Sequence, residues 1–147
     1  MNNKKTIAIA HYGLDRKITQ DECMVALSMQ GNQDVIFIDF ESGNAKLSEL
    51  FDLPFENIAL AQQRKFAEIL KPVLDSNPDA HIAYFGLTPI PVVFHLGYLV
   101  RNTHSYTIYQ LHHKKSMWLA EGDSPFEAYK FEILPLTIMY PKNKTGN

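Results

Sequence analysis

The chain has 147 residues, of which 46% are hydrophobic and 20% are charged, and this ordinary globular composition excludes a disordered or fibrous protein. Its net charge of −2 argues against broad binding to genomic DNA, which needs a strongly basic surface. The single cysteine, Cys23, excludes an internal disulfide, and the apolar run 7–10 is too short for a signal peptide or a membrane span, so we expect a cytoplasmic protein without membrane contact.

The first elements are predicted by an apolar run and by a helix-start motif. The segment Thr6–His11 contains a short continuous apolar run, which is typical of a strand buried on both faces. Thr19 and Glu22 have the spacing of a capping box, in which hydroxyl and carboxylate each bond a free backbone N–H. A helix over 20–30 is expected to follow. It should bury Cys23 as an inert thiol, and Gly31 is well placed to end it.

The middle of the chain predicts one strand and two helices. Residues 34–40 form a second apolar strand, and 45–51 are expected to form a short helix. A longer helix is predicted over 57–70. Pro72 has no backbone donor, so we expect this helix to end or kink near it.

A third strand is predicted over 81–87, followed by a helix over 89–101 with Thr88 as its cap and Pro89 as its first residue. The apolar face of that helix comprises Val92, Val93, Leu96, Leu99 and Val100. Gly97 inside the helix costs about 1 kcal/mol relative to alanine, and a close contact between helix and sheet would explain it.

The last elements are strands. Residues 106–112 form the fourth strand, and 117–120 are expected to form a further short one. Residues 131–140 alternate apolar and other residues, and Pro135 favours a position at the edge of the sheet. Residues 141–147 form a polar tail.

Alternation of strands and helices predicts an α/β fold, namely a Rossmann-like, doubly wound, mainly parallel sheet with antiparallel C-terminal edge strands. We expect residues 1–147 to form a single domain. The sequence lacks the dinucleotide-binding, phosphate-loop, nucleophile-elbow and zinc-binding motifs. We therefore assign no catalytic residue, no metal ligand and no cofactor.

Ligands of parallel α/β sheets bind beyond the carboxyl ends of the strands. The first strand ends at His11, Tyr12 and Gly13, where the glycine allows close backbone approach and the tyrosine ring could stack on a base. A loop stabilised by an aromatic side chain is the structural alternative.

The third strand continues into a helix whose exposed amides attract anions such as phosphate. This second candidate segment consists of Gly86, Leu87, Thr88, Pro89 and Ile90. Its usable amides are those of Thr88 and Ile90, and an ordinary strand-to-helix turn is the alternative.

Further candidates follow the fourth strand. His112 and Lys114 belong to a basic run that could hold phosphates or form a solvated turn. Neighbouring histidines point to opposite sides of a strand, which argues against a metal site. Trp118 could stack on a base or pack in the core. His95 is expected to be satisfied locally rather than to bind a ligand.

Short motifs between His81 and Trp118 resemble the SAVED domain, a sensor module attached to effectors in bacterial cyclic-oligonucleotide defence systems. These motifs are Ala83-Tyr84-Phe85-Gly86, Pro89-Ile90-Pro91-Val92, His95-Leu96-Gly97 and Thr107-Ile108-Tyr109-Gln110. The family is Rossmann-like and is related to the CARF sensors of CRISPR systems.

The resemblance implies that the chain binds a cyclic di-, tri- or tetranucleotide and regulates an effector protein on a separate chain in an antiviral defence system of the CBASS type. It implies that Gly86–Ile90 and His11–Gly13 line the ligand site, with the segment after Tyr109 at its border. Members of the family usually contain two Rossmann-like halves. This chain has the length of one half, so it would pair with itself or with another subunit.

Two other functions stay open. The chain could be a small hydrolase or transferase that acts on a nucleotide, for example by cleaving the cyclic signal, with His11, Tyr12 or His112 in the reaction. It could also be a protein-interaction subunit without a small ligand, with an apolar surface around 131–140.

Overall fold

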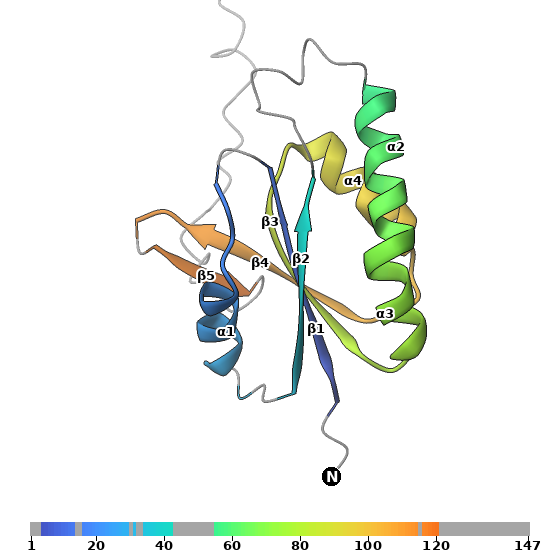
Figure 1. The fold of residues 1–147 in the computed structure, drawn as a ribbon. Helices are drawn as coiled ribbons and strands as arrows, with labels where there is room; N and C mark the ends of the chain where they lie inside the picture. Colours follow the sequence, from blue (N-terminus) through green and yellow to red (C-terminus); the bar gives the residue numbers. More distant parts are fainter. Residues whose placement is uncertain are drawn as a thin grey trace, which may run out of the picture.

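The computed structural model describes residues 4–13, 16–29, 31, 34–42, 55–114 and 116–120. Its elements, in chain order, are β1 (Thr6–Tyr12), α1 (Gln20–Ser28), β2 (Val35–Glu41), α2 (Phe55–Lys65), the π-helix η1 (Phe66–Leu70), α3 (Lys71–Ser76), β3 (His81–Leu87), α4 (Ile90–Val100), β4 (Tyr106–His112) and β5 (Met117–Ala120) (Figure 1). The helix expected at 45–51, the strand expected at 131–140 and the tail 141–147 lie outside the described residues. No helix among those described has the length and apolar character needed to cross a membrane.

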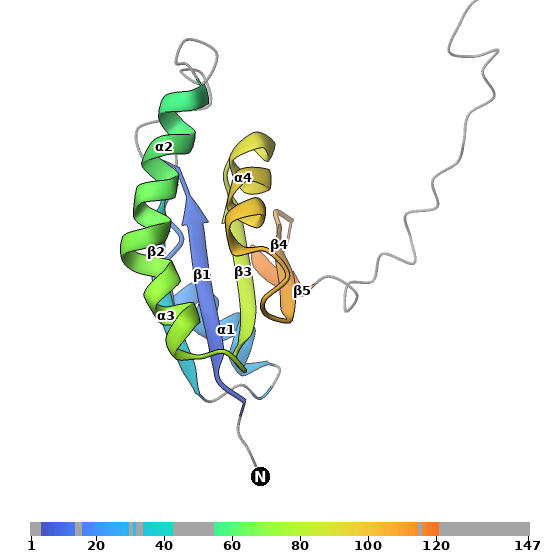
Figure 2. The same cartoon turned by 90° about the vertical axis from the view of Figure 1, so that its right-hand side faces the viewer.

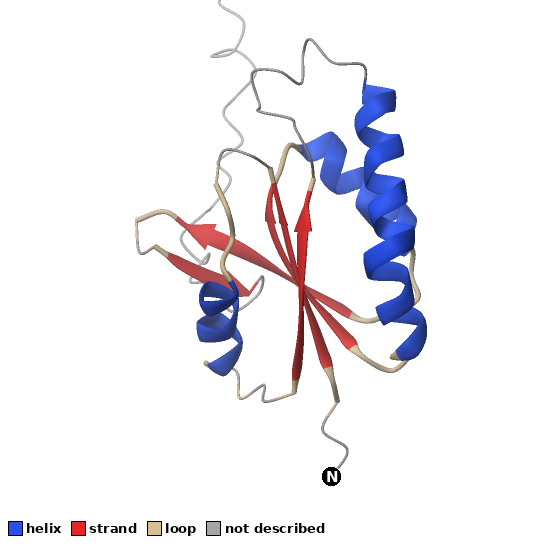
Figure 3. Ribbon diagram, in the orientation of Figure 1, coloured by secondary structure: helices blue, strands red, loops and turns tan. Residues whose placement is uncertain are grey.

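The five strands form one sheet in the order β2-β1-β3-β4-β5. The first four strands of this order are parallel, and β5 pairs with β4 in the antiparallel direction. Helix α1 lies on one face, whereas α2, α3 and α4 lie on the other (Figures 1 and 3). The predicted Rossmann-like, mainly parallel sheet with an antiparallel edge is therefore confirmed.

Strand β1 is buried on both faces because it lies inside the sheet between β2 and β3. Ala8 and Ala10 point into the core under α1, and Ile7 and Ile9 point into the core under α3 and α4. The continuous apolar run, rather than an alternating one, is the expected pattern for such a strand.

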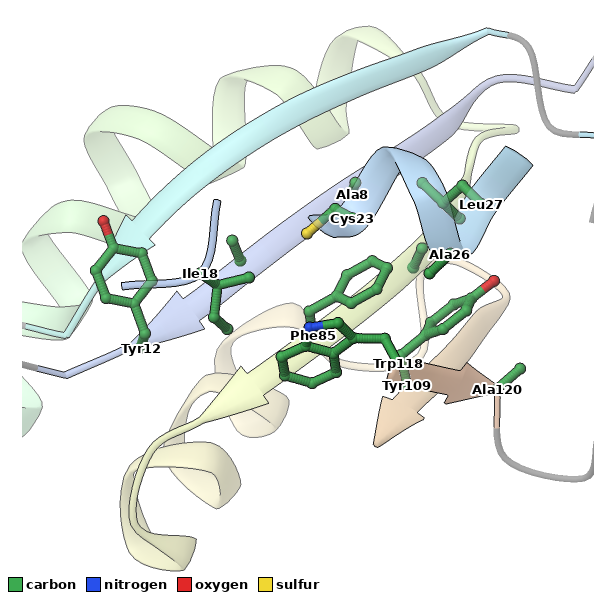
Figure 4. Packing of buried hydrophobic residues seen from close by; sticks show 12 residues of the cluster. Ala8, Tyr12, Ile18, Cys23, Ala26, Leu27, Phe85, Tyr109, Trp118 and Ala120 are labelled. Carbon is green, nitrogen blue, oxygen red and sulfur yellow. The ribbon is translucent and has the colours of Figure 1, made fainter. Parts of the chain in front are cut away.

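The core under α1 is rich in aromatic side chains (Figure 4). Phe85 stacks on Tyr109 with ring centroids 4.4 Å apart and meets Trp118 edge-on at 5.4 Å. Cys23 is fully buried in this core, and burial raises the pKa of its thiol to about 12. The thiol therefore stays protonated at neutral pH, as expected for an inert core cysteine.

The signals predicted for the start and the end of α1, a capping box and a glycine, are both confirmed. The Thr19 backbone N–H donates to Glu22 Oε2 at 2.9 Å, and the Glu22 N–H donates to Thr19 Oγ1 at 3.3 Å. Beyond the helix, Gly31 adopts a φ of 76°, a left-handed conformation that glycine accepts without steric cost.

The helix predicted over 57–70 is observed as α2 and η1, which ends at Leu70, and the helical path then continues through Pro72 to Ser76 as the separate segment α3. The hydrogen-bond pattern changes first: η1 replaces the α-helical pattern, and the Lys71 N–H donates to the Phe66 carbonyl. Pro72 is thus the second residue of a new α-helical segment. Proline is tolerated in the first turn of a helical segment.

Two details of α4 also differ from expectation. Pro89, not Thr88, is the N-cap: its extended backbone directs its carbonyl to the N–H groups of Val92 and Val93, at 3.0 and 3.2 Å. Gly97 makes no close contact with the sheet. It is exposed, and a Cβ added there would meet no atom within 4 Å.

Candidate functional site

The two predicted ligand-binding segments are neighbours at the carboxyl edge of the sheet. His11 is the register partner of Gly86, and Tyr12 is the partner of Leu87. The chain runs from β1 outward to β2 and then crosses back to β3 on the other side of β1. The carboxyl ends of β1 and β3 therefore flank the topological switch point, where ligands of such sheets bind.

A cavity of about 580 Å³ opens at this edge. It is lined by Arg16, Gly86, Leu87, Thr88, Leu111, His113 and Ser116. These residues come from the carboxyl ends of β3 and β4 and from the segments that follow β1, β3 and β4. The volume falls within the range of about 300–1,000 Å³ that is usual for small-molecule sites.

Arg16 supplies the fixed positive charge of the cavity. Its guanidinium forms an ion pair with Glu22, the carboxylate of the capping box, so the side chain is anchored to the start of α1. Nearby, Lys17 Nζ lies 3.7 Å from Asp39 Oδ2. Sequence reasoning missed Arg16. The sequence did contain a signal for it, namely the two neighbouring basic residues Arg16 and Lys17 between the first strand and the capping box.

The start of α4 offers few amide donors to an anion. Pro91 has no N–H, and the Val92 N–H is occupied by the Pro89 carbonyl. The Ile90 N–H is therefore the remaining donor of the first turn. The Thr88 side chain adds a hydroxyl: its Oγ1 is buried and makes no well-formed hydrogen bond to any described residue, although it lies near enough to the Tyr84 hydroxyl to affect that group's pKa.

Gly86 has an internal structural role. A Cβ added at this position would lie 2.6 Å from Tyr84 Cε1 and 2.8 Å from the Tyr84 hydroxyl oxygen. The absent side chain thus makes room for the tyrosine ring. Gly86 also lines the cavity, so the same position serves both the packing of Tyr84 and the shape of the cavity wall.

His11 is fully buried in a polar network and does not line the cavity. Its Nδ1 lies 2.8 Å from the Tyr84 hydroxyl, and its Nε2 lies 3.1 Å from Gln62 Oε1. Because an amide oxygen can only accept, Nε2 carries the proton and Nδ1 accepts from Tyr84. Burial lowers the pKa of His11 to about 4, so the ring is neutral at pH 7.

Gln62 extends this network to α4. Its Nε2 donates to the Val92 carbonyl at 3.1 Å and to His95 Nδ1 at 2.9 Å. His95 thus has a hydrogen-bond partner inside the protein, as expected, but this partner comes from α2 and not from a neighbouring residue. Sequence reasoning missed Gln62. Its position four residues after the buried Ile58 places it on the buried face of α2, which marks a polar side chain that needs partners.

Tyr12 packs into the core under α1 and is 5% exposed (Figure 4). Its hydroxyl donates to Asp39, and burial together with this carboxylate raises the pKa of the phenol. The ring does not line the cavity. Gly13 follows it, half-buried, at the loop end of β1.

Of the basic run that begins at the last residue of β4, His113 lines the cavity, whereas His112 and Lys114 do not. His112 points to the other side of the strand, and its Nδ1 is buried without a hydrogen-bond partner among the described residues. Lys114 is exposed. Trp118 is 5% exposed and packs against Phe85, so it belongs to the core in this structure.

A family model described as "SMODS-associated and fused to various effectors sensor domain" (SAVED) matches residues 62–143, which is more than half of the chain. The match begins inside α2 and includes β3, α4, β4 and β5. It therefore contains every cavity-lining residue except Arg16. A search of curated proteins finds no match. Within the described part of the chain, no group of three or more His, Cys, Asp or Glu side chains is arranged to hold a metal ion.

Proposed function

Because the chain belongs to the SAVED family of sensor domains, we propose that it binds a cyclic oligonucleotide in the cavity at the carboxyl edge of the sheet. The observation that carries the proposal is the coincidence of two independent facts. The family match covers the carboxyl ends of β3 and β4 and the segments that follow them, and these parts form most of the wall of a cavity at the topological switch point.

The cavity has the donors that a phosphodiester requires. The Arg16 guanidinium binds phosphate oxygens in a bidentate manner, and His113 adds a ring N–H. The buried Thr88 hydroxyl supplies a neutral donor in the cavity wall, whereas Pro89 and Ile90 at the start of α4 do not line the cavity. A phosphate at Arg16 would compete with Glu22 for the guanidinium, so ligand binding acts on the start of α1 as well.

As a sensor, the chain acts through differential binding: the ligand favours one conformation or assembly, and that state regulates an effector on a separate chain. In this proposal the chain pairs with a second copy or with another subunit, and the exposed apolar side chains of α4 offer a place for such pairing.

The buried positions of the candidate catalytic residues favour binding over turnover. His11 has both ring nitrogens engaged, and Tyr12 donates its hydroxyl to Asp39. Neither of these residues, nor His112, lines the cavity. An enzymatic role would require another reactive group there.

Isothermal titration calorimetry of the full chain with cyclic di-, tri- and tetranucleotides tests the proposal. We expect micromolar or tighter binding of one of them, and Arg16→Ala should weaken it by at least about tenfold because a charge-assisted phosphate contact is lost. Lys71→Ala is the matched control, since Lys71 is also an exposed, ion-paired cation but lies on α3. Its affinity should equal that of the unmodified chain.

The absence of binding to any of these nucleotides would refute the proposal. Equal losses in both variants would mean that general charge, not the cavity, attracts the ligand. Analysis of the bound nucleotide after prolonged incubation separates the enzymatic alternative, which predicts linear products.

A further inference from the structure

Ser116, in the turn between β4 and β5, lines the ligand cavity and has an unusual backbone conformation. Its φ is 49°, in the left-handed region, where the Cβ of an L-amino acid comes close to the carbonyl oxygen that follows it. Among the described residues other than glycine, only Arg101 also has a positive φ. Glycine, and less often asparagine, is the usual residue in such a conformation. A serine at this position therefore has a conformational cost that a glycine would not have.

Contacts within the chain do not explain this serine. Ser116 is exposed, and its hydroxyl forms no hydrogen bond with any residue that the structure describes. The hairpin turn itself requires only a residue that accepts a positive φ, and glycine does so at the lowest cost. Strained residues cluster at ligand-binding sites, where the strain accompanies a functional side chain. The position of Ser116 on the cavity wall indicates such a role.

The apolar part of the cavity wall consists of Leu87 of β3 and Leu111 of β4. Phe85 and Tyr109 are register partners on these strands, and each leucine lies two residues further along its strand. Side chains two residues apart point to the same face of a sheet, so the leucines continue the aromatic core under α1 toward the carboxyl edge. An apolar wall with a few polar groups is typical of a small-molecule site, and this one suits the flat face of a nucleobase.

The turn that holds Ser116 lies next to this apolar wall. Figure 2 shows β4 and β5 at the edge of the sheet beyond β3, in agreement with the strand order. Ser116 directly precedes Met117, which pairs with His112, the last residue of β4. Leu111 is the residue before His112, so the serine and the leucine are close neighbours at this end of the sheet. Arg16, in contrast, comes from the segment after β1.

The two polar groups suit different parts of a nucleotide. The guanidinium of Arg16 carries a full charge and binds phosphate oxygens. The hydroxyl of Ser116 is neutral and both donates and accepts, and the edge of a nucleobase presents donors and acceptors side by side. A base that packs against Leu87 and Leu111 has the turn between β4 and β5 beside it.

We propose that Ser116 is a specificity-determining residue of the cavity: a nucleobase of the cyclic oligonucleotide packs against Leu87 and Leu111, and the Ser116 hydroxyl forms a hydrogen bond with the edge of this base. A glycine would relieve the backbone strain but could not make the bond. The assignment rests on the proposed function, since it names the base-binding part of the same cavity.

Two substitutions separate the hydroxyl from the backbone strain. Ser116→Ala removes the hydroxyl and keeps the strained Cβ, whereas Ser116→Gly removes both. In calorimetric titrations with the cyclic di-, tri- and tetranucleotides, both variants should bind about three- to tenfold more weakly than the unmodified chain, as expected for the loss of one neutral hydrogen bond. The melting temperature should rise by about 2–4 °C in Ser116→Gly alone, because only glycine accepts the left-handed conformation without steric cost. A purely structural role would change stability and leave affinity unchanged.

Arg101→Gly is the matched control, because Arg101 has the other positive φ, 59°, and does not line the ligand cavity. This variant should also melt at a higher temperature, with its affinity unchanged. Inorganic pyrophosphate is a probe with charge but no base, so the unmodified chain and Ser116→Ala should bind it equally.

Unchanged nucleotide affinity in Ser116→Ala, or an equal loss in Arg101→Gly, would overturn the assignment. So would weaker pyrophosphate binding in Ser116→Ala, since the hydroxyl would then contact a phosphate. A Ser116→Gly variant that melts no higher than the unmodified chain would remove the strain on which the inference depends. If none of the nucleotides binds the unmodified chain, the proposed function fails and this assignment fails with it, whereas binding that is insensitive to Ser116→Ala overturns the assignment alone.

Discussion

Acid should destabilise the protein through His11, the residue at the centre of the buried network. In the unfolded chain histidine titrates at its ordinary pKa of 6.5, whereas burial lowers the pKa of His11 in the folded protein to about 4. The unfolded state therefore binds the proton more readily. The stabilising contribution is complete above pH 6.5 and is lost as the pH falls toward the folded-state value.

The size of the effect follows from the two pKa values. The difference between 6.5 and about 4, at about 1.36 kcal/mol per pKa unit, corresponds to roughly 3 kcal/mol of unfolding free energy. The physical cause is desolvation of an imidazolium that has Tyr84 on one ring nitrogen and Gln62 on the other. Protonation of Nδ1 would also replace the bond accepted from Tyr84 by a contact between two donors, unless the hydroxyl turns.

Urea denaturation between about pH 7 and pH 4 measures this contribution. Other groups titrate in the same range, so the informative quantity is the difference between the unmodified chain and His11→Gln. We expect this variant to be less stable at neutral pH and to lose less stability on acidification. His104→Gln is the control, because His104 lies outside the network and its removal should leave the acid sensitivity unchanged.

The reasoning would be refuted if His11→Gln and the unmodified chain lost the same stability over this range. That result would mean that the folded protein accommodates the charged ring, for example through water that reaches Nδ1. An equal change in His104→Gln would instead assign the acid sensitivity to several histidines together.

Two further predictions concern the same region. Gln62→Leu keeps the size of the side chain but leaves the Nε2 proton of His11 without an acceptor and removes the amide donor to the Val92 carbonyl and to His95 Nδ1. The free energy of unfolding should therefore fall by about 2–4 kcal/mol in urea denaturation, whereas a cost below about 1 kcal/mol would mean that water replaces the amide. Gly86→Ala should lower the free energy of unfolding by about 1–3 kcal/mol, because its methyl group collides with the Tyr84 ring. In a double-mutant cycle, the shorter side chain of Tyr84→Val should relieve most of this loss, and strictly additive losses would contradict the collision.

Local patterns in the sequence determined the main elements of the fold. The strand 81–87 was predicted with the bounds that the structure has, and Thr19 and Glu22 marked the start of α1. These signals depend on neighbouring residues only: a strand that is apolar throughout is buried on both faces, and a capping box satisfies two N–H groups within one turn. The alternation of such elements then restricts the sheet to a parallel, doubly wound form.

Local signals were incomplete where the backbone path or the side of a helix decided the outcome. The helical path continued beyond Pro72, and a π-helical segment, η1, precedes the proline. Gly97 was expected to touch the sheet, but it lies on the outer side of α4. Periodicity places a residue on a side of its helix and does not say whether another molecule covers that side.

The sequence by itself determined which segments end at the carboxyl edge of the sheet, because that follows from strand direction and order along the chain. Tertiary structure alone decided which side chains reach the cavity there. Successive residues of a strand point to opposite faces, and a strand buried on both faces has no pattern that distinguishes them. His11 and Tyr12 therefore point into separate cores, while Arg16 and His113, far apart in sequence, line one cavity.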